Sequence, residues 1–112
     1  MPFNEFLFQL EHATAVSAKN RLAREFAAAN TSPIIAESCA TFFYLSEDAQ
    51  QVALEGDWTH WQPTAPMTYL PDTPLWYRLE RFPRAARLEY RLVVNDNRRL
   101  LDPHNPRTAP SG

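Results

Sequence analysis

The hydrophobic period of the chain changes at Pro33, and this change limits the possible folds more than any other feature. Before Pro33, apolar residues recur at helical spacing. After it, runs rich in Phe, Tyr, Val and Leu alternate with polar residues and are separated by Pro, Asp and Asn clusters. Strands that follow one another without intervening helices favour a sandwich over a parallel sheet. The sequence therefore predicts a mainly β protein, a β-sandwich preceded by an N-terminal helical segment.

The helical segment is assigned to residues 1–32 and is predicted to hold two helices. Phe3, Phe6 and Leu10 share one face of the first helix, and Phe26 lies on the apolar face of the second. Each face needs an apolar partner. That partner is either the sandwich or a further domain outside this sequence.

The sandwich is assigned to residues 33–106. In its clearest strand, Leu88, Tyr90, Leu92 and Val94 alternate with a second, more polar set, so we expect these four side chains to face the core. The expected strands are residues 41–45, 51–55, 67–70, 75–81, 88–95 and 99–101.

Charge and composition exclude several kinds of partner. The net charge is −2 with acids and bases interspersed, so there is no basic field to attract nucleic acid. No apolar run approaches the roughly 20 residues that cross a bilayer, so we expect no membrane partner. The single cysteine, Cys39, cannot form an internal disulfide, and no signal peptide precedes Pro33. These features predict a cytoplasmic protein.

Catalysis is unexpected because the chain has only two glycines, and Gly112 is terminal. A phosphate-binding loop needs several glycines within a few residues, and a hydrolase nucleophile turn needs small flanking residues. We therefore predict that the chain itself is not an enzyme and uses no cofactor. No metal site is predicted either. Neither His60, which is close to Glu55, nor His104 has a second histidine at ligand spacing.

The three tryptophans Trp58, Trp61 and Trp76 leave two interpretations open. Flat aromatic rings stack well on sugar rings when polar neighbours fix the hydroxyl groups. Tryptophan in a small domain also packs in the core or against a partner domain.

Residues 52–63, which include Gly56, Asp57 and Trp61, precede Pro66, Trp76, residues 89–96 and residues 101–106 in a recognisable order. This order resembles the early-set, immunoglobulin-like domain found at the N-termini of isoamylases and glycogen-branching enzymes. The same domain occurs in the glycogen-binding module of the AMP-activated kinase β subunit and in certain esterases. The resemblance covers roughly residues 38 to 106 and implies an immunoglobulin-like early-set sandwich.

In the glycan-binding members of this family, a tryptophan at the place of Trp61 and a lysine at that of Arg91 belong to the sugar platform. A second tryptophan follows the last long strand, where this chain has Arg98 or Arg99 instead. Half of the platform is therefore missing. The candidate carbohydrate-binding residues are Trp61, Arg91, Asn95, Trp58 and Arg98.

The esterase branch shares further features with this chain. These are the preceding helices, the Pro-Ile-Ile segment that begins at Pro33, residues 85–90, and the Asp-Pro-x-Asn-Pro segment at residues 102–106, where the chain leaves the sandwich. In enterochelin-esterase and esterase D-like hydrolases, such an exit leads to an α/β-hydrolase domain. The resemblance implies that residues 107–112 are a linker to a C-terminal hydrolase domain absent from this sequence.

Three functional hypotheses follow. The leading one is a non-catalytic accessory domain of a larger hydrolase, esterase-like or related to glycoside hydrolases, which packs beside the catalytic domain and shapes its substrate entrance. The second is a carbohydrate-binding module for α-glucan. The third is a free-standing interaction domain that forms a homodimer through an exposed sheet edge.

Overall fold

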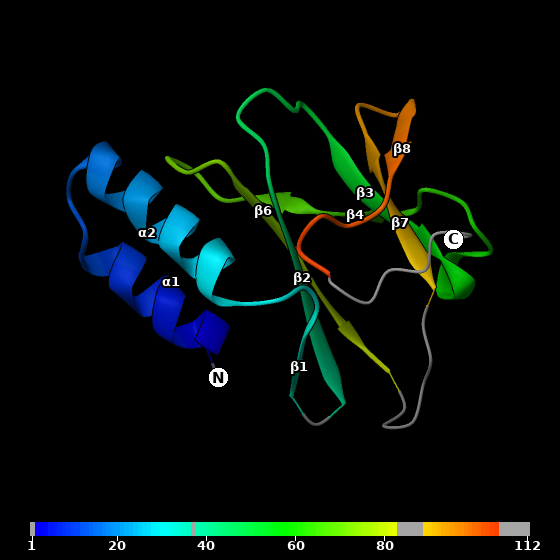
Figure 1. Ribbon diagram of the computed structural model, residues 1–112, viewed down its shortest axis with the longest axis horizontal. Coiled ribbons are helices and arrows are strands. Elements are labelled where there is room, and N and C mark those ends of the chain that lie inside the picture. The colour runs from blue at the N-terminus through cyan, green and yellow to red at the C-terminus, as the bar shows by residue number, and fades with distance from the viewer. Residues whose placement is uncertain (1, 37, 83–88, 106–112) are drawn as a thin grey trace.

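The computed structural model describes residues 2–36, 38–82 and 89–105. They form two helices and two four-stranded antiparallel sheets, arranged as three layers (Figure 1). The helices α1 (Pro2–His12) and α2 (Val16–Ala29) lie side by side against one sheet, and the second sheet packs on the opposite face of the first.

The helix-covered sheet has the strand order β1-β2-β6-β5, and the open sheet has the order β4-β3-β7-β8. A short 3-10 helix, η1 (Asp57–Thr59), follows β3. The strands of the helix-covered sheet are β1 (Ile34–Ala36), β2 (Cys39–Leu45), β5 (Thr68–Tyr69) and β6 (Leu75–Arg81). Those of the open sheet are β3 (Val52–Gly56), β4 (Ala65–Pro66), β7 (Tyr90–Val94) and β8 (Arg98–Leu100).

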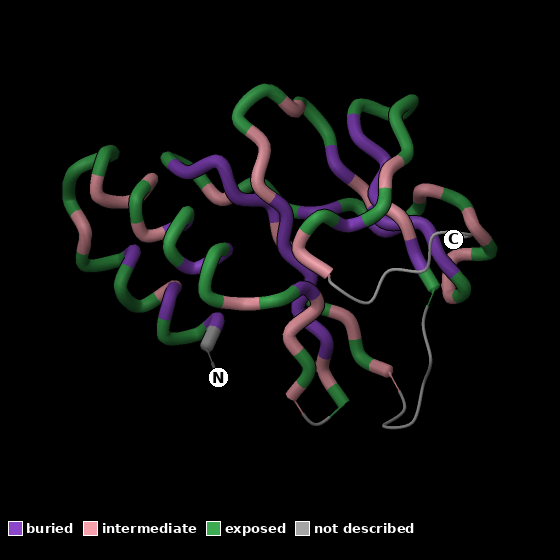
Figure 2. Tube along the Cα trace, in the orientation of Figure 1, coloured by how far each residue is buried: buried purple, intermediate pink, exposed green. Residues whose placement is uncertain are grey.

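Strand β2 is buried on both faces, as the continuous purple stretch of the trace shows (Figure 2). Phe42 and Tyr44 point into the core between the two sheets, whereas Phe43 points to the helices. This double burial explains why β2 is an almost unbroken apolar run, because a strand covered on both faces has no solvent side to keep polar.

The helices pack on this sheet through aromatic side chains. The ring of Phe3, which is 1% exposed, lies 5.7 Å from that of Phe26 and 5.0 Å from that of Tyr77 in β6. The sandwich is therefore the apolar partner that the two helices need. Helix α1 begins at Pro2, and Val16 at the start of α2 is exposed.

The observed strands differ from the expected ones chiefly at two places. Strand β1 was not expected, and the single strand expected over residues 67–70 is replaced by β4 and β5, because the chain leaves one sheet for the other at Met67. Tyr90, Leu92 and Val94 face the core between the sheets as predicted. Val93, on the other face, is also buried, and Leu88 lies outside the described residues, as do 107–112.

The edges of the two sheets are short strands: β1 and β5 in one sheet, β4 and β8 in the other. Pairing of two copies through such an edge stays a prediction. Neither described helix is long and apolar enough to cross a membrane.

Candidate functional site

The outer face of the open sheet carries a buried carboxylate beneath two arginines. Glu55 in β3 pairs across the sheet with Arg91 in β7, and Arg99 in β8 lies one strand further on. The Glu55 Oε1 atom accepts a hydrogen bond of 2.6 Å from Arg99 Nε and lies 3.4 Å from Arg91 Nη2. The side chain of Glu55 is 1% exposed, whereas those of Arg91 and Arg99 are 35% and 44% exposed. One buried acid thus anchors two guanidinium groups that reach solvent.

Trp61 lies beside this ion-pair cluster. Its ring centroid is 5.1 Å from the Arg91 guanidinium carbon, within the range of a cation–π contact. The loop that positions Trp61 is tight: His60 and Trp61 both adopt left-handed backbone angles, with φ of 54° and 58°. The Trp61 amide donates a 3.0 Å hydrogen bond to the carbonyl of Gly56. Two consecutive non-glycine residues in this conformation are strained, and such strain concentrates at functional sites.

Gly56 is required at the base of this loop by close packing. Its φ of −176° is ordinary extended backbone, so the sharp left-handed turn lies at His60 and Trp61. A Cβ at Gly56 would lie 2.6 Å from the carbonyl oxygen of Glu89 and 2.7 Å from the ring of Trp58. Only glycine lets β3, η1 and the start of β7 approach one another this closely.

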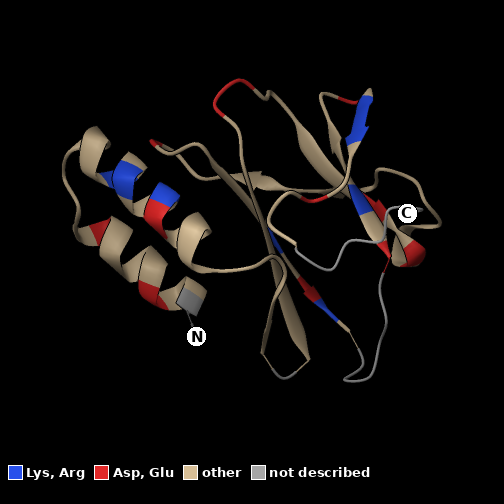
Figure 3. Cartoon of the chain, in the orientation of Figure 1, with Lys and Arg blue, Asp and Glu red and all other residues tan. Residues whose placement is uncertain are grey.

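Arg91 keeps unused hydrogen-bonding capacity. Its Nε atom is buried and has no hydrogen-bond partner among the described residues. Buried donors are nearly always paired, so an unpaired one is a reason to look for a ligand oxygen. The Trp61–Arg91–Arg99–Glu55 surface therefore combines an aromatic ring with fixed, positively charged donors. Figure 3 marks the basic positions along β7 and β8 in blue.

The other three candidate residues lie elsewhere. Trp58 packs at the edge of the core, with its ring stacked on Phe42 at 5.9 Å and its Nε1 atom donating a 2.6 Å hydrogen bond to Glu80. Asn95 holds a turn, since its side-chain oxygen accepts hydrogen bonds from the amides of residues 50 and 51. Arg98 pairs with inward-facing Val94, so its side chain lies on the opposite face of the sheet from Trp61.

Sequence reasoning missed Glu55 and Arg99 as members of this surface. Glu55 was considered only as a neighbour of His60 in a possible metal site, and Arg99 only as a replacement for a tryptophan. The missing information is the register, because Glu55↔Arg91 and Val93↔Arg99 pairs can be assigned only once the strands are aligned. The described residues contain no group of three or more metal-ligating side chains.

A second buried polar cluster, here called the latch, joins the two sheets near the end of the described chain. The Tyr90 hydroxyl of β7 donates a 2.7 Å hydrogen bond to Asp102, and the Ser32 amide donates one of 2.9 Å to the carbonyl of His104. Asn105 Nδ2 donates to the Tyr90 hydroxyl at 3.1 Å. The latch thus ties the connection before β1 to the segment that follows β8.

Burial dominates the protonation equilibria of the latch. Desolvation raises the pKa of Asp102, since the charged carboxylate loses water, although the bond from Tyr90 opposes the shift. Desolvation also raises the pKa of Tyr90 and lowers that of His104, because burial disfavours the charged form of each. The ring of Tyr90 also packs in the core between the two sheets.

No family model matches the chain, and no curated protein matches it. Among solved structures, it is similar to ligand-free PulA from Klebsiella pneumoniae, with 23% identity, and to apo pullulanase from the same organism, with 21% identity. Each similarity covers 61% of this chain at a TM-score of 0.48, and the chain spans only 7% and 8% of those two proteins. Similarity at this level identifies no family.

Proposed function

We propose that this chain is a non-catalytic accessory domain of the early-set type from a larger hydrolase, and that its open sheet binds α-glucan at Trp61 and Arg91. One observation carries the proposal: the Arg91 guanidinium lies 5.1 Å from the centre of the Trp61 ring and is anchored by buried Glu55. A sugar ring offers an apolar C–H face for an indole and hydroxyl oxygens for N–H donors.

The fixed position of the arginines supports binding. A free arginine side chain loses rotamer freedom when it grips a ligand, whereas one already held by a buried carboxylate has lost much of that freedom on folding. Arg91 and Arg99 share such an anchor in Glu55. Their remaining N–H groups are therefore oriented before a glucan arrives.

The same geometry argues against chemistry on this surface. A general acid or base must reach the proton that it transfers. Glu55 is 1% exposed and lies beneath two guanidinium groups, so a substrate on this face would not contact it. Asp57 accepts a hydrogen bond from the backbone amide of Glu89 and so holds the loop.

Native electrophoresis in gels containing glycogen tests the proposal. We expect glycogen to retard the chain, and we expect Trp61→Ala and Arg91→Ala each to weaken the retardation at least about tenfold, or about 1.4 kcal/mol. Phe8→Ala is the matched control, because this ring is exposed on α1, far in the fold from the open sheet. Migration of the unaltered chain that does not respond to glycogen would rule out glucan binding.

A further inference from the structure

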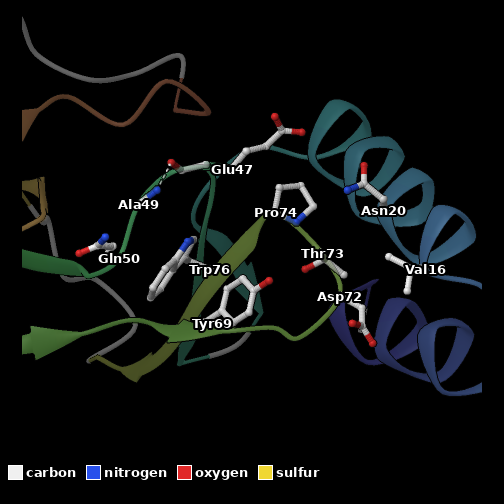
Figure 4. A pocket seen from close by; sticks show the side chains of 11 residues that line it. Val16, Asn20, Glu47, Ala49, Gln50, Tyr69, Asp72, Thr73, Pro74 and Trp76 are labelled. Carbon is white, nitrogen blue, oxygen red and sulfur yellow. Dashed lines mark hydrogen bonds between the residues drawn. The ribbon is translucent and has the colours of Figure 1, made fainter.

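A pocket separate from the Trp61 surface lies where α2 meets the end of the sandwich (Figure 4). Its volume is about 560 Å³, within the range of sites that bind small molecules. Three elements line it: the first turns of α2, the loop between β2 and β3, and the segment from β5 into β6. We call it the Trp76 pocket.

Two aromatic side chains form one wall of this pocket. The rings of Tyr69 in β5 and Trp76 in β6 are 5.3 Å apart and tilted by 53°, as cross-strand neighbours on one face of the sheet. Tyr69 is 47% exposed, although a ring of this size is costly to leave in water. In Figure 4, both rings lie below the loop that carries Glu47 and Gln50.

Trp76 supplies the observation that points to a ligand. Its side chain is only 7% exposed, and its Nε1 atom has no hydrogen-bond partner among the described residues. The indole nitrogen is a donor only, so what it lacks is an oxygen or another acceptor. By contrast, the indole nitrogen of Trp58 is bonded to Glu80. Figure 4 shows the Trp76 nitrogen on the ring edge that faces the loop holding Gln50.

The charge around the pocket selects a neutral ligand. Glu47 and Asp72 line it, but Arg24 pairs with Glu47 and Lys19 Nζ lies 3.4 Å from Asp72. Because each carboxylate is paired with a basic side chain, the charge around the pocket is balanced and favours neither a cation nor an anion. The uncharged polar side chains of Asn20 and Gln50 also line the pocket.

We infer that the Trp76 pocket binds a neutral sugar, one or two pyranose units long, with a ring on Tyr69 and Trp76 and a hydroxyl oxygen accepting from Trp76 Nε1. An aromatic wall, an unpaired donor, side-chain amides and balanced charge together match a ring that is apolar on its face and hydroxylated on its rim. Only the choice of an α-glucoside as the sugar rests on the proposed function. The pocket itself shares no residue with the Trp61 surface.

Titration of the ¹⁵N-labelled chain with maltose tests the inference, because each tryptophan reports on a different place. The indole N–H signal of Trp76, assigned by its loss in Trp76→Phe, is expected to shift with saturation, while that of Trp58 serves as the structural reference. Tyr69→Ala should weaken maltose binding at Trp76 about tenfold, a loss of about 1.4 kcal/mol. Trp61→Ala should leave the Trp76 response unchanged, and gluconate, an acyclic anion, should produce none.

The three signals separate this inference from the proposed function. If maltose moves the Trp61 signal and leaves Trp76 unmoved, the Trp76 pocket is not a sugar site, although the glucan surface stands. If the Trp76 signal moves and that of Trp61 does not, the pocket is confirmed and the proposed surface is wrong. A Trp76 shift that disappears in Trp61→Ala, or persists at full affinity in Tyr69→Ala, also overturns the inference.

Discussion

The helix-covered sheet and the open sheet differ in what lies on their outer faces. The outer face of the first meets the helices through Phe43, Leu75 and Tyr77. That of the second carries Glu55 and Arg91, with Trp61 beside them. One sheet is an inner layer of the molecule, whereas the arginines on the outer face of the other are partly exposed to solvent.

This difference shows what the helices contribute. In a sandwich without them, the apolar side chains of β2 and β6 on the helix-facing side would be exposed, and Phe43 alone would leave a large ring in water. The helices therefore complete a second core. Because they cover one sheet, the outer face of the other is the one left without a covering layer among the described residues.

The largest expected effect comes from removing an aromatic ring of the second core. Phe3→Ala deletes a side chain enclosed by Phe6, Phe26 and Tyr77, and should lower the free energy of unfolding by about 3–5 kcal/mol in urea denaturation. Phe8→Ala, on the exposed side of the same helix, should change it by less than about 0.5 kcal/mol. Equal effects of the two variants would mean that the helices are not an integral layer.

A smaller effect is expected on the open sheet. Glu55→Gln removes the charge shared by Arg91 and Arg99 and should destabilise the fold by about 1–2 kcal/mol. The loss stays below the value for a fully buried ion pair because both guanidinium groups reach water. Glu25→Gln, which breaks an exposed pair on α2, is the control and should cost less than about 0.5 kcal/mol. If the two variants are alike, the buried anchor has no structural role.

The smallest effect concerns pH and the latch that joins the two sheets. Burial holds the pKa of His104 below its ordinary value of 6.5, so its contribution to stability is fully present above pH 6.5 and is lost as pH falls through the folded-state pKa. His104→Gln should remove this dependence. Asp102 acts oppositely, since its raised pKa favours the folded state at low pH. The measurement is therefore the difference between the unfolding free energies of the unaltered chain and of His104→Gln, followed from pH 7 downwards. A difference that does not change with pH would contradict the prediction.

The sequence predicts local features of this fold well. The strand expected over residues 75–81 matches β6 to the residue, and the apolar faces of both helices are the buried ones. Period-based reasoning succeeds there because each pattern is contained within one element. It fails at Met67, where the chain crosses between sheets and no change of residue type signals the crossing.

Features made by distant segments could not be predicted. Trp61 and Arg91 were placed together through a family resemblance, but their anchor at Glu55 depends on how β3 aligns with β7. Asn95 was offered as a sugar contact, yet its oxygen holds a turn, which only the path of the neighbouring loop reveals. The Trp76 pocket likewise needs three elements in place before it exists.

The latch also determines how the domain would transmit mechanical force. Tension on the chain beyond Asn105 is delivered first to Tyr90 and to the backbone bond between Ser32 and His104. One of these contacts leads to β7 of the open sheet. The other leads to the segment that joins α2 to β1, the first strand of the helix-covered sheet. A pull at this point is therefore shared by both sheets and the helical layer, instead of peeling β8 from its edge.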